Sequence, residues 1–177
     1  MASKPHKKTW NEEMADLFRT SEAAAAALPE PYLFKFWDLD KKYFVLLEDK
    51  LVADVKTSNS PEQLMAVLPN KALDSAQYPM FMGPEKKKSC LYCVKSGTGQ
   101  YQIELKEKDI MELEKDPQNA KAFTFYSKQE GNGDKCTFES AEFPDWFIST
   151  SSEAGKPIGL SQKGGTQNIL FHFEKKS

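Results

Sequence analysis

The stretch that decides the fold is Phe138-Glu139-Ser140-Ala141-Glu142-Phe143-Pro144-Asp145-Trp146-Phe147-Ile148-Ser149-Thr150-Ser151. It joins two strand-like runs across a proline-aspartate turn. Phe147 and Ile148, beside the β-branched Thr150, favour a pleated and half-buried conformation. Pro144 fixes φ and prevents a helix from running through the turn. On spacing alone, the stretch predicts one β-hairpin of an all-β core.

Short apolar runs separated by turn residues continue along the chain beyond Pro31. This punctuation, without long helical periodicity, is typical of an all-β domain. Residues 96–99 and 131–134 are predicted hairpin loops. Three stretches each follow the order strand, polar turn, strand, which suggests a threefold pseudo-repeat: Lys42 to Asp54, Lys88 to Lys106 and Lys121 to Ser140. The connector from Asp109 to Leu113 is expected to form one helical turn.

Length and charge restrict the classes of protein that this chain can belong to. With 177 residues it is most simply one domain plus a tail. It carries 24 basic and 26 acidic residues, and Arg19 is its only arginine. This balance argues against a nucleic-acid partner. Since no apolar run approaches the length that spans a bilayer, membrane insertion is not expected either.

The segment before the all-β region has a different pattern. Trp10, Met14, Leu17 and Phe18 recur at helical spacing between charged residues, which predicts a short amphipathic helix. An isolated helix of this length is marginal in water. The alternative interpretation is a helix that binds a partner or a membrane surface. No secretory signal pattern is present, so composition alone predicts a cytosolic protein.

Few residues could support catalysis or hold a metal or cofactor. The only histidines are His6 and His172, which is too few for the usual zinc sites or catalytic triads. Cys90 and Cys93 have Cys-x-x-Cys spacing, but residues three apart in a strand point to opposite faces. With Cys136 they are expected to be buried structural thiols. The basic run 86–88 is either a heparin-like or membrane-surface contact or, as we expect, a solvated hairpin tip.

The opening stretch also resembles the signature of the interleukin-1 family. The matching residues are Phe138, Glu139, Ser140, Ala141, Phe143, Pro144, Trp146, Phe147 and Ile148. Further blocks in family order, from about Phe34 to Phe173, resemble the family's strands: 36–38, 42–46, 51–53, 89–95, 103–113, 122–126 and 171–173. The interleukin-36 subgroup, with the interleukin-36 receptor antagonist and interleukin-38, is the most similar.

This resemblance implies a β-trefoil of about twelve strands with pseudo-threefold symmetry, at residues 32–177, after a flexible N-terminal pro-segment at residues 1–31. It implies a cytokine that performs no bond chemistry, uses no cofactor or metal, and acts outside the cell after leaderless release from the cytoplasm. A monomer is expected, which binds a receptor of the interleukin-1 receptor family and recruits an accessory protein if it is an agonist. The alternative is a trefoil that binds glycans or inhibits proteases.

Particular residues follow from the same resemblance. Trp37, Leu170 and His172 match positions that bear on receptor binding or signalling, although relatives carry an acid or a lysine where this chain has Leu170. The alternative for Trp37 is packing on the rim of the barrel. Counting back from the Phe36-Trp37-Asp38 block predicts processing between Ala26 and Ala27. The loop at residues 68–74 resembles that of antagonists, whereas residues 105–113 and 143–148 resemble agonists, so the sign of signalling stays open.

Overall fold

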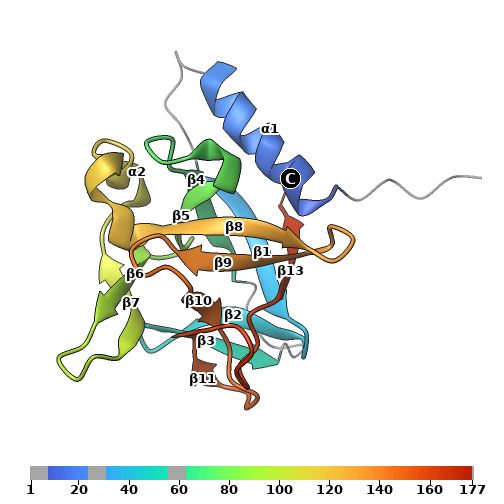
Figure 1. The fold of residues 1–177 in the computed structure, drawn as a ribbon, viewed down its shortest axis with the longest axis vertical. Coiled ribbons are helices and arrows are strands. Elements are labelled where there is room, and N and C mark those ends of the chain that lie inside the picture. The colour runs from blue at the N-terminus through green and yellow to red at the C-terminus, as the bar shows by residue number, and fades with distance from the viewer. Residues whose placement is uncertain (1–7, 24–30, 56–62, 177) are drawn as a thin grey trace, which may run out of the picture.

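The computed structural model describes residues 8–23, 31–55 and 63–176. Strands dominate this part of the chain (Figure 1). They are β1 Tyr32–Asp38, β2 Lys42–Leu47, β3 Lys50–Val55, β4 Met65–Pro69, β5 Pro79–Pro84, β6 Ser89–Lys95, β7 Tyr101–Glu107, β8 Thr124–Glu130, β9 Lys135–Ser140, β10 Phe147–Ser149, β11 Lys156–Pro157, β12 Gly159–Ser161 and β13 Phe171–Lys175. The helices are α1 Trp10–Ala23 and α2 Ile110–Leu113, with 3-10 turns at η1 Ser75–Gln77, η2 Pro117–Asn119 and η3 Lys121–Phe123.

Six of the strands close into a barrel. β1 pairs with β4, β4 with β5, β5 with β8, β8 with β9, β9 with β13, and β13 returns to β1, all antiparallel. A closed ring leaves no unpaired sheet edge along these strands. The first and last strands of the domain are therefore neighbours, and β1 and β13 share the register Phe36↔Phe173 and Trp37↔His172.

Three hairpins extend from this barrel: β2–β3, β6–β7 and β10–β12. Barrel plus three hairpins is the β-trefoil, as expected. The grouping of the third repeat was wrong, however. Residues 121–140 form the barrel hairpin β8–β9, and the third cap hairpin is β10–β12. The short polar turn at 131–134 resembles the turn of a cap hairpin in sequence. The third cap hairpin instead has very short strands, which are joined by a long connection, residues 150–158, that contains β11.

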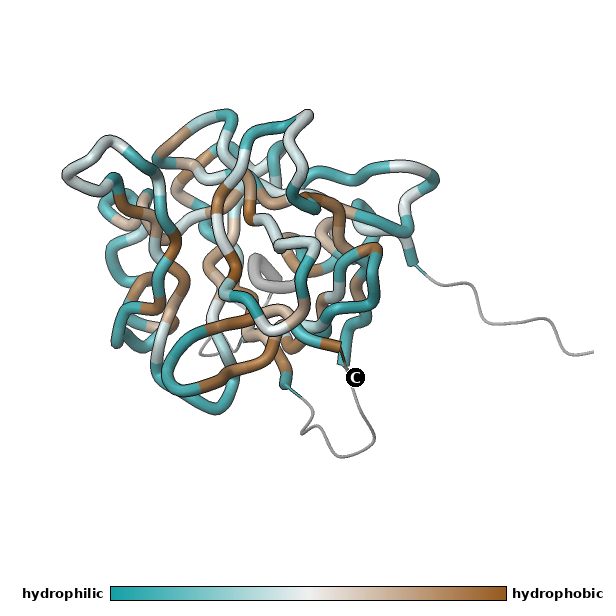
Figure 2. Tube along the Cα trace, turned by 90° about the horizontal axis from the view of Figure 1, so that it is seen from below, coloured by the Kyte–Doolittle hydropathy of each residue, from teal (hydrophilic) through white to brown (hydrophobic). Residues whose placement is uncertain are grey.

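The core is made by alternation along the strands. In β1, Phe34, Phe36 and Asp38 are buried, and the residues between them are more exposed, as the period of two requires. Phe36 packs edge to face on Phe138 with ring centroids 5.1 Å apart. Seen from below, hydrophobic stretches run mostly through the interior of the trace, and many of the outermost bends are hydrophilic (Figure 2).

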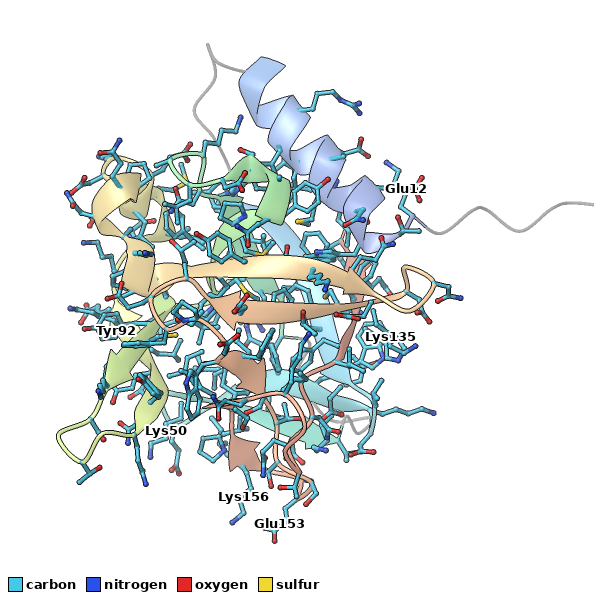
Figure 3. The ribbon with its side chains drawn as sticks, in the orientation of Figure 1. Glu12, Lys50, Tyr92, Lys135, Glu153 and Lys156 are labelled. Atoms are coloured by element: carbon cyan, nitrogen blue, oxygen red, sulfur yellow. The ribbon has the colours of Figure 1, made fainter. Side chains whose placement is uncertain are left out.

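The N-terminal helix differs most from expectation. Instead of standing as an isolated, marginal helix, α1 packs onto the barrel: Trp10 and Met14 have no exposed surface, and Leu17 is 1% exposed. It lies at the end of the molecule opposite β2, β3 and β11 (Figure 1). In Figure 3, Glu12 marks the α1 end, and Glu153 and Lys156 mark the other. The helix therefore covers the barrel end that the three hairpins leave open.

Several local predictions are confirmed. Residues 96–99 and 131–134 form the turns of β6–β7 and β8–β9. The 109–113 connector is α2, which begins where the Asp109 carboxylate accepts a hydrogen bond from the Met111 N–H at 3.0 Å. Cys90 and Cys93 are free and buried, and they face two different apolar clusters, so they do point to opposite faces of β6. Cys136 is also free and buried.

Candidate functional site

The signature residues form the corner between β9 and β10. Phe138 and Phe147 are buried in or beside the core. The Ser140 hydroxyl accepts a hydrogen bond from the Phe143 N–H at 3.0 Å, and the Glu139 carboxylate accepts one from the Asp145 N–H at 2.7 Å. The second bond holds Asp145 at a φ of 72°, in the left-handed region that few residues other than glycine adopt.

The aromatic residues of the same corner pack outside the barrel. Phe143 and Trp146 both lie 4.6 Å, centroid to centroid, from the ring of Tyr101 on β7. Pro144, between them, is exposed. The signature thus joins the third trefoil unit to the second hairpin.

The expected receptor-contacting residues Trp37 and His172 lie together on the outer face of β1 and β13. Their rings stack with centroids 5.7 Å apart and an interplanar angle of 21°. Tyr43 on β2 also stacks on the Trp37 indole, with ring centroids 5.1 Å apart and an interplanar angle of 26°. We call Tyr43, Trp37 and His172 the aromatic ladder. Its rings are half-buried, so they keep accessible surface while their positions are held by each other.

The ladder exists because of strand register. Trp37 is opposite His172 in the β1–β13 pair and opposite Tyr43 in the β1–β2 pair. Directly opposed side chains on one face of a sheet lie within contact distance. Leu170, the third expected contact, is half-buried and immediately precedes β13. It lies two residues before His172.

A buried ionic network lies next to the ladder, at the end of β1. The Asp38 carboxylate accepts hydrogen bonds from the Thr150 hydroxyl at 2.5 Å and the Lys42 N–H at 2.9 Å, and the Lys42 ammonium lies 3.0 Å from it. The side chains of Asp38 and Lys42 are 0% and 3% exposed. Asn168 donates to Asp40 at 3.1 Å and to Asp38 at 3.5 Å. The network therefore ties the end of β1 to residues 150 and 168.

The charges of this network are mutually stabilised. Burial acts to raise the pKa of Asp38, but hydrogen bonds from Thr150 and Lys42 and the Lys42 charge outweigh it, and the pKa is lowered. Burial likewise acts to lower the pKa of Lys42, but Asp38 and Asp40 raise it. Both groups are charged at neutral pH. Since Asp38 follows Trp37 directly, the ion pair fixes the backbone that carries the indole.

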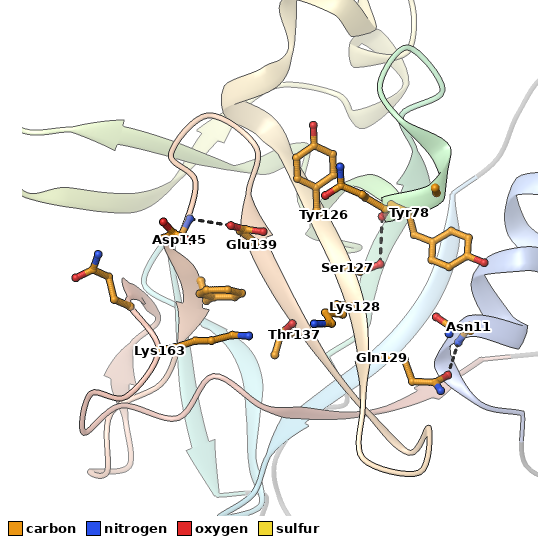
Figure 4. Close-up of a pocket in the computed structure, with 14 residues that line it drawn as sticks. Asn11, Tyr78, Tyr126, Ser127, Lys128, Gln129, Thr137, Glu139, Asp145 and Lys163 are labelled. Atoms are coloured by element: carbon orange, nitrogen blue, oxygen red, sulfur yellow. Dashed lines mark hydrogen bonds between the residues drawn. The ribbon is translucent and has the colours of Figure 1, made fainter.

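A groove of about 910 Å³ lies on another face, between α1 and β10. Its walls include Asn11 of α1, whose N–H donates to the Gln129 side chain at 2.9 Å (Figure 4). Lys128 and Lys163 border it together with Glu139 and Asp145. The lining is therefore polar and of mixed charge. Because Asn11 contributes to the wall, the shape of this groove depends on α1.

The remaining expectations concern residues outside these sites. Lys86 and Lys88 of the basic run are exposed, and Lys87 forms an ion pair with Asp49. The run is a surface turn but not a hairpin tip, because β5 pairs with β4 and β8, whereas β6 pairs with β7. Ala26 and Ala27, the expected processing site, lie outside the described residues. Within the described ranges, no three His, Cys, Asp or Glu side chains gather as metal ligands. None of the helices described there has the length and apolarity needed to cross a membrane.

Sequence reasoning missed three features of the site: Tyr43, the Asp38–Lys42 pair and the docking of α1. The helix had a signal that could have been used. Thr9 and Glu12 form a capping box: the Thr9 hydroxyl accepts from the Glu12 N–H at 3.2 Å, and the Glu12 carboxylate accepts from the Thr9 N–H at 2.9 Å. No local sequence pattern predicts the other two features, Tyr43 in the ladder and the Asp38–Lys42 pair, because both depend on strand pairing.

Fold and site together define a β-trefoil whose outer face carries the aromatic ladder. The family profile described as Interleukin-1 / 18 matches residues 56–175. Interleukin-36 alpha of Homo sapiens is 33% identical over 148 residues, covering 81% of this chain and 92% of that protein. The interleukin-1 receptor antagonist protein of Canis lupus familiaris is 33% identical over 147 residues, covering 81% and 79%.

Solved structures agree. The solution structure of interleukin-36alpha matches with a TM-score of 0.68 and 30% identity, covering 85% of this chain and 97% of that one. Chicken interleukin 1 beta matches with a TM-score of 0.70 and 27% identity, covering 82% and 99%. The chain belongs to the interleukin-1 family of cytokines. It is accordingly a signalling ligand and not an enzyme.

Proposed function

We propose that this cytokine binds a receptor of the interleukin-1 receptor family, of the interleukin-36 type, through a surface centred on the aromatic ladder and Leu170. The observation that carries the proposal is the stacking of Trp37 between Tyr43 and His172. Tryptophan and tyrosine supply much of the binding energy in protein interfaces. A ladder already ordered before binding loses little side-chain entropy on association.

The buried network supports this assignment. A charged pair with almost no exposed surface is costly to build, and here it holds the strand end directly beside Trp37. The proposed role of Asp38 and Lys42 is to position the ladder, without contacting the receptor themselves.

Direct binding tests the proposal. Immobilised extracellular domains of the interleukin-36 receptor are exposed to the full chain and to Trp37→Ala. We expect the substitution to weaken binding by about 30-fold, the effect of losing roughly 2 kcal/mol from a central anchor. Tyr92→Ala is the matched control, because Tyr92 is a half-buried ring on β6 that lies outside the ladder. Equal binding by Trp37→Ala and the unmodified chain would refute the assignment.

We further propose that the ligand is released without a leader, acts outside the cell as a monomer, and is processed between Ala26 and Ala27, within a pro-segment at residues 1–31 that precedes the trefoil at 32–177. Mass spectrometry of the secreted form identifies its first residue. An intact start at Met1 or Ala2 would contradict processing.

The sign of signalling is tested on cells that carry the interleukin-36 receptor and its accessory protein. The relatives include both an interleukin-36 alpha and a receptor antagonist. Activation by the protein alone identifies an agonist. Suppression of a known agonist's response identifies an antagonist.

A further inference from the structure

The open end of the barrel is lined by aromatic side chains, and α1 fills it. The Trp10 ring lies 5.7 Å from Phe34, 6.1 Å from Phe36, 5.7 Å from Phe138 and 5.0 Å from Phe173, measured between centroids. These four rings come from β1, β9 and β13. We call them the aromatic floor. It is a pocket for one large side chain, and the helix supplies that side chain.

The rest of the helix continues the same contact. Met14 and Leu17 are buried in the core cluster that contains the floor, and Phe18 packs on Tyr78 with centroids 5.4 Å apart. Positions 10, 14, 17 and 18 form one apolar stripe of an α-helix. The barrel end therefore accommodates two turns of an amphipathic helix, which extends the interface well beyond a single anchor residue.

Polar contacts fix the start of the helix on the barrel. The first N–H groups of a helix lack partners within it. Here the Trp10 N–H donates to the Gly133 carbonyl at 2.9 Å, and the Asn11 N–H donates to the Gln129 side chain at 2.9 Å. The β8–β9 hairpin thus supplies acceptors for the first N–H groups of α1. Gly133 is also needed for the approach, since a Cβ there would lie 2.5 Å from Thr9 Cγ2.

Every one of these contacts is noncovalent, and together they resemble a helix seated in a groove of a partner protein. We propose that the open end of the barrel is a binding site for an amphipathic helix, that its ligand is the chain's own Thr9–Phe18 segment, and that this segment stays bound after the chain is cut between Ala26 and Ala27. Removal of the N-terminal segment then takes two steps, cleavage and dissociation.

The helix-binding site lies close to the aromatic ladder. Phe36 and Phe173 belong to the floor, and their neighbours Trp37 and His172 belong to the aromatic ladder on the outer face of the same strand pair. Occupied and empty states of the floor therefore differ directly beneath the ladder. The binding site itself is defined by these contacts alone and does not depend on the receptor assignment.

The test uses the full chain with a site-specific protease recognition sequence inserted between Ala26 and Ala27. After complete cutting, native size-exclusion chromatography with mass spectrometry shows where the N-terminal fragment elutes. We expect it to co-elute with the trefoil. With Trp10→Ala it should separate, whereas with Trp10→Phe, which keeps a ring on the floor, it should remain bound.

A second measurement avoids any variant that fails to fold. The cut, unsubstituted protein is mixed with an excess of fluorescent peptide of residues 8–23, and exchange is followed by anisotropy. The unmodified peptide should replace the fragment, and the Trp10→Ala peptide should bind on the order of 100-fold more weakly. The proposal is overturned if the unmodified fragment separates from the cut trefoil, whether or not the trefoil stays folded afterwards. Equal binding of the two peptides also overturns it. Neither outcome alters the receptor-binding test.

Discussion

The indole of Trp10 packs edge to face on the ring of Phe173, with centroids 5.0 Å apart and an interplanar angle of 69°. A residue near the start of the chain and one in its last described strand thus belong to the same core cluster. The N-terminal helix is consequently part of the trefoil's packing in the intact chain.

Replacing Trp10 should therefore affect stability. Trp10→Ala removes a fully buried ring and is expected to lower the free energy of unfolding by about 3–5 kcal/mol. Trp10→Phe should cost much less, because it keeps an aromatic ring and removes an indole N–H that is buried without a partner. Urea unfolding followed by circular dichroism measures both. Equal losses for the two variants would contradict the packing described above.

The close approach of Thr9 to Gly133 predicts a specific cost for a β-carbon. Gly133→Ala should destabilise the protein both by strain, at a φ of +100°, and by the clash with Thr9. Gly131→Ala is the matched control: it also has positive φ, +62°, but the nearest atom to its added Cβ, Asp134 Oδ1, would be 3.6 Å away. Thermal unfolding of both variants, with Thr9→Gly added to each, isolates the clash, because a Cβ at position 133 would lie 2.5 Å from Thr9 Cγ2 and 2.7 Å from Thr9 Cβ. Only the Gly133 variant should be partly rescued.

The Asp38–Lys42 pair predicts how stability depends on pH. Because the pKa of Asp38 is lowered by folding, its contribution is present above the ordinary value of 3.8 and is lost as pH falls through the folded pKa. Because the pKa of Lys42 is raised, its contribution is present below 10.5 and is lost as pH rises through the folded value. Urea unfolding across pH 2 to 6 should show the acid loss.

Asp38→Asn tests the same pair at neutral pH. It leaves the Lys42 ammonium buried without its principal counter-charge, so we expect a loss of about 3–5 kcal/mol. The variant should also lack the Asp38 part of the acid dependence. A double substitution, Asp38→Leu with Lys42→Met, should recover part of the stability because no lone charge remains. Unchanged stability in Asp38→Asn would show that the pair is not coupled as described.

The cysteines should be unreactive in the native protein. Burial raises the pKa of Cys90 and of Cys93 to about 12 and that of Cys136 well above its usual range. At pH 8 the thiolate fraction of the first two is then on the order of one in ten thousand. A chromogenic thiol reagent should react with all three free thiols in guanidinium and with none within minutes in native buffer. Rapid labelling of the native protein would place a thiol at the surface.

Much of the architecture follows from local sequence. Turn residues at 96–99 and 131–134 and the Asp109 cap each act within a few positions, so they could be predicted from residue types alone. The opposite directions of Cys93 and Cys90, toward two different apolar clusters, follow from the strand period. The third trefoil unit could not be assigned this way, because the short strands of β10–β12 have almost no periodicity of their own.

For the candidate site, too, the sequence predicts only some of the features, and strand pairing decides the others. Trp37 and His172 were identified by family resemblance, but their contact depends on β13 returning to pair with β1, and Tyr43 joins them only through the β1–β2 register. Similarly, Trp10, Met14 and Leu17 predict an amphipathic helix without saying what covers its apolar stripe.

By itself, the sequence determined an all-β chain of the interleukin-1 type, because turn chemistry, strand alternation and the Phe138–Ser151 signature are properties of neighbouring residues. Only the tertiary structure decided that α1 seals the barrel, that Asp38 and Lys42 form a buried pair beside Trp37, and that three rings from three strands stack into one surface. These features join residues far apart in the chain, and closure of the barrel is what brings such residues into contact.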